Sequence, residues 1–111
     1  MNLFTWMLVG HLAGDFLLQS SWMAERKEAE WMPLLTHCFV YTVSVAVFAL
    51  PAGGISPAAV ALIFLAHLVF DKRKLVRLWA KHVSRVGGNN WLEVVQDQSW
   101  HIMVLAAATL L

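Results

Sequence analysis

Charge is the scarcest property of this sequence. Only 14% of its 111 residues are Asp, Glu, Lys or Arg, whereas 59% are hydrophobic. Soluble domains usually carry about 25% charged residues. The charged residues gather in two stretches, residues 25–30 and 71–97, and Asp15 alone lies outside them. The rest consists of apolar blocks of membrane-spanning size, so the composition predicts an integral membrane protein rather than a soluble domain.

Cysteine is also scarce, and the N-terminus has no basic segment. The single cysteine, Cys38, excludes an intrachain disulfide, and its apolar neighbours predict a small buried thiol. Residues 1–4 contain no Lys or Arg, so no secretory signal peptide is predicted. The net charge of +1 gives no indication of a nucleic-acid partner, and we expect none.

Four apolar blocks predict four transmembrane helices within a single domain, residues 1–111. The expected helices cover about residues 2–18, 33–50, 57–71 and 91–111. A bilayer core about 30 Å thick needs about 20 helical residues, so these slightly short spans favour little tilt and local thinning of the bilayer. The predicted fold is all-α, an integral membrane four-helix bundle made of two helical hairpins.

The basic residues predict the orientation in the membrane. All eight Lys and Arg fall in two connecting loops, residues 20–32 and 72–90. The positive-inside rule therefore places both loops in the cytoplasm and both termini outside.

The second basic loop contains an amphipathic pattern. Residues 72–86 alternate apolar and basic side chains at helical spacing, and Gly87-Gly88 would end the helix. We expect a basic interfacial helix on the inner leaflet, with an anionic lipid headgroup as a possible ligand. The headgroup contacts would be Lys72, Arg73, Lys74 and Arg77. The alternative is an anchor that only joins the third and fourth spans.

Each predicted span also carries one polar pair at i, i+4 spacing, which puts both members on one helix face. The pairs are His11/Asp15, His37/Tyr41, His67/Asp71 and Asp97/His101. Counted from the outer helix ends, one member of each pair lies ten residues deep and the other fourteen. At 1.5 Å per residue these depths are about 15 and 21 Å. The pattern predicts two aligned layers, with His11, Tyr41, His67 and His101 nearer the midplane.

Ionisable groups in hydrocarbon are costly, so these side chains should face inward and share one site. Histidine and carboxylate ligands suit a divalent metal ion such as zinc, iron or manganese. The predicted metal ligands are His11, Asp15, His67, Asp71, Asp97 and His101, with His37 and Tyr41 as acid/base or orienting groups. Two alternatives stay open: a metal-free hydrogen-bonded network that joins the helices, and a proton or ion path.

The polar pairs belong to longer motifs. These are His11-x-x-x-Asp15-Phe16-x-x-Gln19, Trp22-Met23-Ala24, His37-x-x-x-Tyr41, His67-x-x-x-Asp71 and Asp97-Gln98-x-x-His101. Together they resemble a family of small bacterial and phage membrane proteins catalogued as domain of unknown function 3307. The resemblance covers nearly the whole chain. It implies a multi-helix protein of the bacterial inner membrane and supplies no activity.

Two functions follow from this site. The first is metal-dependent hydrolysis of a lipid-linked ester or phosphoester, in which a metal polarises the ester and activates water. Gln19 and Gln98 would then lie next to the metal ligands and orient them by hydrogen bonds. The second is a structural subunit of a homo-oligomer or larger membrane assembly, in which the cluster holds a structural metal or packs the helices. Whether the protein is an enzyme stays open at this stage.

Overall fold

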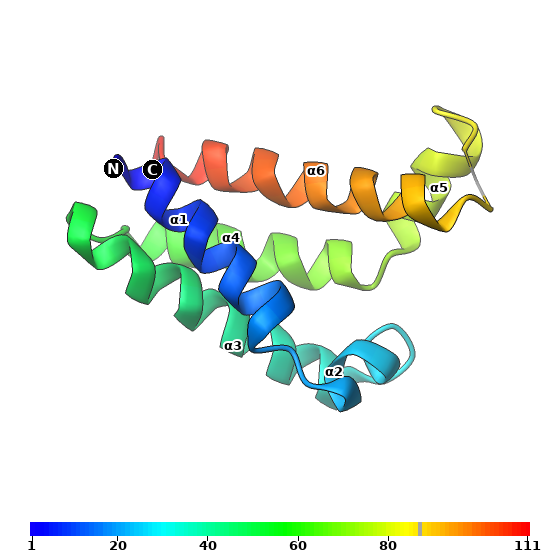
Figure 1. Cartoon of the computed structure of the whole chain (residues 1–111), viewed down its shortest axis with the longest axis horizontal. Helices are drawn as coiled ribbons and strands as arrows, with labels where there is room; N and C mark the ends of the chain where they lie inside the picture. The colour runs from blue at the N-terminus through cyan, green and yellow to red at the C-terminus, as the bar shows by residue number, and fades with distance from the viewer. Residues whose placement is uncertain (87) are drawn as a thin grey trace.

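The computed structural model describes residues 1–86 and 88–111, and this part of the chain forms six α-helices and no strand. The all-helical prediction is therefore confirmed. The α-helices are α1 (Leu3–Leu12), α2 (Ser21–Arg26), α3 (Trp31–Ala49), α4 (Pro57–Asp71), α5 (Lys74–His82) and α6 (Asn90–Ala108). A π-helical turn, η1 (Ala13–Leu17), continues α1, and a 3₁₀ turn, η2 (Leu50–Ala52), follows α3. Both termini and the turn after α3 lie at one end of the molecule, and α2 and α5 lie at the other (Figure 1).

The short helices differ from the sequence expectation. The loop expected at residues 20–32 contains α2, whose first turn is capped by Ser20 Oγ accepting from the backbone N–H of Met23 at 3.3 Å. The expected amphipathic helix of residues 72–86 is shorter, because Arg73 adopts a left-handed conformation (φ 62°) and α5 begins after it. Gly87, expected to end this helix together with Gly88, lies outside the described residues.

Close packing of α1 and η1 against α3 depends on two glycines. A Cβ atom on Gly10 would lie 2.8 Å from Val45 Cα, and one on Gly14 would lie 3.0 Å from Tyr41 Cδ2. Ser44 Oγ also donates to the carbonyl oxygen of Gly10 at 2.9 Å. Small residues four apart on one face allow helix backbones to approach this closely. The contact brings the polar pair of the first helix directly onto α3.

The apolar core fills the end of the bundle that holds the termini. Its buried side chains come from α1, α3, α4 and α6 and are Met7, Tyr41, Val45, Ala49, Ala59, Ile63, Leu105 and Ala108. Tyr41 is the polar edge of this core. Of the four polar pairs, this core includes Tyr41 alone.

Helix length and composition give one candidate membrane span among the described residues. The segment Trp31–Ala52, which combines α3 and η2, is 22 residues long with a mean hydropathy of 1.8. Two further apolar helices, Leu3–Leu17 and Pro57–Asp71, are shorter than a typical span.

Candidate metal centre

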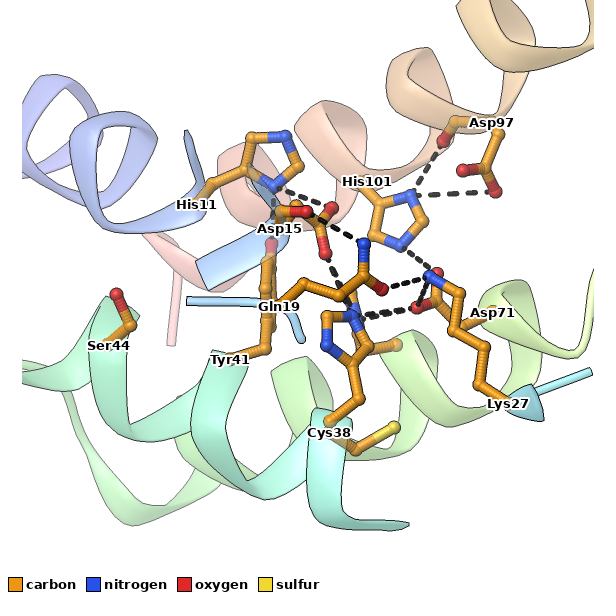
Figure 2. Close-up of polar contacts among 12 residues, drawn as sticks. His11, Asp15, Gln19, Lys27, Cys38, Tyr41, Ser44, Asp71, Asp97 and His101 are labelled. Carbon is orange, nitrogen blue, oxygen red and sulfur yellow. Dashed lines mark hydrogen bonds and ion pairs between the residues drawn. The ribbon is translucent and has the colours of Figure 1, made fainter. Parts of the chain in front are cut away.

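All four polar pairs converge inside the bundle (Figure 2). Each of the eight residues is at most 8% exposed: His11, Asp15, His37, Tyr41, His67, Asp71, Asp97 and His101. They come from the first helix and its π turn, α3, α4 and α6, so every long helix contributes one pair. The structure therefore brings together all the site residues that the sequence singled out.

Asp71 is the hub of the cluster. Its Oδ2 lies 2.9 Å from His37 Nε2 and 3.0 Å from His67 Nε2. Its Oδ1 lies 3.1 Å from His101 Nε2. One buried carboxylate thus faces three imidazoles from three helices, with each oxygen directed to a different side.

Two overlapping groups have the arrangement needed to hold a metal ion. In the first, one ligand atom from each of Asp15, His37, His67 and Asp71 lies within 4.8 Å of the others. The second consists of Asp71, Asp97 and His101 under the same limit. All members are buried. Three or four nitrogen and oxygen ligands match the coordination of zinc and other first-row metals.

The hydrogen bonds of the cluster test this interpretation. His67 Nε2 and His101 Nε2 lie close to Asp71, but neither nitrogen has a hydrogen-bond partner among the described residues. Asp15 Oδ2 and Asp97 Oδ1 are buried without one as well. Buried polar atoms normally have hydrogen bonds. Here, nitrogen and carboxylate oxygen atoms lie close together without hydrogen bonds. Metal ligands are arranged around a cation in the same way, so these residues fit a divalent metal ion.

His11 lies beside these groups rather than within them. Its Nε2 is 2.8 Å from Gln98 Oε1, and its Nδ1 is 2.7 Å from the Tyr41 hydroxyl. A neutral His11 that donates from Nε2 to Gln98 accepts at Nδ1 from Tyr41, so both ring nitrogens are occupied. The Tyr41 ring stacks on His67, with centroids 3.8 Å apart and planes at 14°. These contacts orient His67 toward the carboxylates.

His37 belongs to the four-residue group, whereas the sequence analysis gave it an acid/base or orienting role. Its Nε2 lies 3.0 Å from Asp15 Oδ1 as well as 2.9 Å from Asp71 Oδ2. The next residue, Cys38, is a buried free thiol, as expected.

Asp15 is presented by the π-helical turn. The wider turn is closed by the backbone N–H of Leu18, which donates to the carbonyl oxygen of Ala13 at 2.8 Å. The carboxylate of Asp15 lies 3.0 Å from His37 Nε2 and 3.6 Å from Nδ1 of His11, which lies in the preceding turn. π-helical turns occur often at functional sites because they redirect side chains. Here the turn directs Asp15 toward α3.

Lys27 is the residue that sequence reasoning missed. Its ammonium group donates to Asp71 Oδ2 at 2.8 Å and to Gln19 Oε1 at 2.7 Å, and the side chain is only 15% exposed (Figure 2). The sequence analysis counted it as one of the loop cations. No helical spacing links Lys27 to Asp71, 44 residues away, so the periodic pattern carries no signal for this contact.

The cavity beside the centre is small. It is lined by Tyr41, His67 and His101, among others, and has a volume of about 10 Å³. That is room for about one water molecule. A larger molecule does not fit in this cavity.

A family model described as Protein of unknown function (DUF3307) matches residues 3–111, so the chain belongs to this family. The match confirms the resemblance found in the motifs. Searches of the curated proteins and of the solved structures each found no match.

Proposed function

We propose that this protein is a multi-pass protein of the bacterial inner membrane whose buried His/Asp centre binds divalent metal. The observation that carries the proposal is the pair of overlapping ligand groups that share Asp71. One ion would occupy the group of Asp15, His37, His67 and Asp71. The group of Asp71, Asp97 and His101 is the place for a second ion, since the two oxygens of Asp71 face the two groups separately.

The distribution of polarity supports the membrane setting. The acids and imidazoles lie inside, while large apolar side chains are exposed on all four long helices. Examples are Leu12, Phe39, Leu65 and Met103, which are 49%, 64%, 57% and 60% exposed. Extensive exposed apolar surface is typical of contact with lipid or another protein. A four-span bundle in a locally thinned bilayer would cover this surface.

The orientation follows from the same arrangement. All eight Lys and Arg lie in the segments around α2 and α5, at the end of the molecule opposite both termini (Figure 1). The positive-inside rule would then place this end in the cytoplasm and both termini outside.

Two activities are compatible with such a centre, and one observation bears on each. Hydrolysis of a lipid-linked ester or phosphoester is supported by Lys27, a cation at the edge of the ligand groups that can meet an anionic substrate. The metal, zinc, iron or manganese, would polarise the ester and activate water. A structural metal site in a homo-oligomer or membrane assembly is supported by the small cavity of about 10 Å³ beside the centre.

Metal content is the first measurement. The protein, purified in mild detergent, would be analysed by elemental mass spectrometry beside Asp71→Asn, which keeps the side-chain shape but removes the shared carboxylate. Glu93→Gln, on α6 but outside both ligand groups, is the control. We expect stoichiometric metal in the wild type and the control, and loss in the Asp71 variant. A wild type that stays metal-free after loading with zinc, iron and manganese would reject the proposal in favour of a hydrogen-bonded helix-packing network.

Turnover separates the two activities. A metal-loaded hydrolase should cleave lipid-linked esters or phosphoesters, and His67→Ala should remove that turnover while the helical signal in circular dichroism stays. A metal-loaded protein that cleaves none of these substrates, and that crosslinks to itself or to a partner in native membranes, would instead be structural.

A further inference from the structure

Two apolar grooves of similar size lie on the outside of the bundle. The first, between α4, α5 and α6, has a volume of about 550 Å³, and its lining includes Phe70, Leu75, Leu78, Trp79, Val83 and Trp100. The second, between α3 and α4, has a volume of about 520 Å³, and its lining includes Phe39, Val43, Pro57, Val60 and Leu65. In a bilayer, hydrocarbon would meet both. Volume and polarity therefore do not distinguish them.

Charge does distinguish them. On α5, Leu78 points into the first groove, and Lys74 and Lys81 are its neighbours at i−4 and i+3 on the helix surface. Both lysines are exposed. In the described part of the chain, neither of them pairs with a carboxylate. The segments that line the second groove, residues 39–46 and 57–65, contain no Lys or Arg.

Two other cations near α5 are already engaged. Arg77 pairs with the carboxylate of Glu28, and Lys72 donates to the carbonyl oxygen of the same residue at 3.2 Å. The sequence analysis included both in the expected headgroup site, together with Arg73, which is half-buried, and Lys74. On α5 itself, the exposed lysines are therefore Lys74 and Lys81.

The groove is fixed in place and ends next to the metal centre. Val76 and Ala80 on α5 are fully buried and hold the helix against the bundle. The floor is aromatic, with Phe70 stacked on Trp100 at 5.7 Å and 12°. Phe70 also lines the small cavity beside His101, so a single ring separates the groove from the centre.

We infer that this groove binds one hydrocarbon chain of an anionic lipid from the cytoplasmic leaflet, whose headgroup is held by Lys74 and Lys81. The inference rests on the membrane placement proposed above, and it supplies a binding site for a lipid-linked substrate where the centre itself has no room. The groove's volume lies within the range of about 300–1,000 Å³ that is usual for small-molecule sites. The free cations provide the charge complementarity that the second groove lacks.

The test is native mass spectrometry of the protein released from nanodiscs that contain equal amounts of phosphatidylglycerol and phosphatidylcholine. The wild type should retain phosphatidylglycerol in preference to phosphatidylcholine. The double variant Lys74→Gln/Lys81→Gln should lower this preference roughly 30-fold, because each cation near a membrane surface contributes about fivefold. Leu78→Trp should fill the groove and reduce retention of both lipids. Leu65→Trp, in the uncharged groove, is the matched control and should change neither.

Three results would overturn the inference: a wild type without preference, a double variant that keeps the preference, or Leu78→Trp behaving like Leu65→Trp. Metal content, measured on the same samples after loading with zinc, iron and manganese, keeps this test separate from the metal proposal. Selective lipid retention without metal upholds the groove and rejects the metal centre. Bound metal without selective lipid retention upholds the metal centre and rejects the groove.

Discussion

Replacing Lys27 with methionine should make the metal-free protein less stable and its metal binding tighter. In the structure the Lys27 ammonium lies 2.8 Å from Asp71 Oδ2, the same oxygen that faces His37 and His67. A tethered cation therefore pairs with an oxygen that the first ligand group would offer to a metal ion. A metal ion would compete with it for Asp71 Oδ2.

The magnitude follows from the burial of the pair. Removing one partner of a buried ion pair costs about 3–5 kcal/mol, because the other charge is left uncompensated. Here Lys27 is 15% exposed, and Asp71 keeps three imidazole nitrogens within 3.1 Å, so we expect a loss of about 2 kcal/mol. The same free energy no longer opposes metal binding in the variant. An affinity gain of roughly 30-fold follows, since 1.4 kcal/mol corresponds to a factor of ten.

The assay has two parts. Thermal unfolding in detergent, followed by tryptophan fluorescence, should show the midpoint of the metal-free variant lowered by about 10 °C. Competition titration with a chelating dye should show zinc bound more tightly than in the wild type. Lys72→Met is the matched control, because Lys72 contacts the carbonyl oxygen of Glu28 and the ring of Trp31 rather than Asp71. Unchanged or weaker zinc binding in the Lys27 variant would show that the ammonium and the metal do not compete, and would refute the reasoning.

Three further predictions concern the same bundle. Gly10→Ala places a Cβ atom 2.8 Å from Val45 Cα and should cost about 1–3 kcal/mol in stability, and an unchanged unfolding midpoint would contradict the close packing. Tyr41→Phe removes the hydroxyl bonded to His11 and should cost about 1 kcal/mol while metal content stays constant; loss of all metal would make Tyr41 a ligand. Asp97→Asn alters only the second ligand group, so elemental analysis should still find the ion of the first group; a metal-free variant would indicate one ion shared by both groups.

The sequence predicted the composition of the site because helical periodicity is local. Spacing of four residues puts both members of a pair on one face, and equal depth in antiparallel helices aligns the pairs. Contacts within each predicted layer are present, between His11 and Tyr41 at 2.7 Å and between His37 and Asp15 at 3.0 Å. Other contacts join the layers, such as His101 to Asp71 at 3.1 Å. The sequence analysis gave His37 an acid/base or orienting role, whereas the structure places it in the first ligand group.

What the sequence could not predict depends on tertiary structure. Lys27 reaches Asp71 because α2 packs against α3. Nothing in the spacing of the loop cations distinguishes Lys27 from Arg26. The π turn at Ala13–Leu17 and the left-handed conformation of Arg73 are likewise backbone conformations that the composition does not predict. The close approach of α1 to α3 was encoded in Gly10 and Gly14, four residues apart, and this signal could have been recognised.

Glu28 connects α5 with the residue that contacts Asp71. It follows Lys27 directly in the chain. Its carboxylate pairs with Arg77 on α5, and its carbonyl oxygen accepts from Lys72, the residue after α4. α5 is therefore linked through Glu28 to the preceding residue, Lys27, whose ammonium group contacts Asp71. A displacement of α5 would therefore be transmitted to Lys27 and would alter the charge balance of the buried centre.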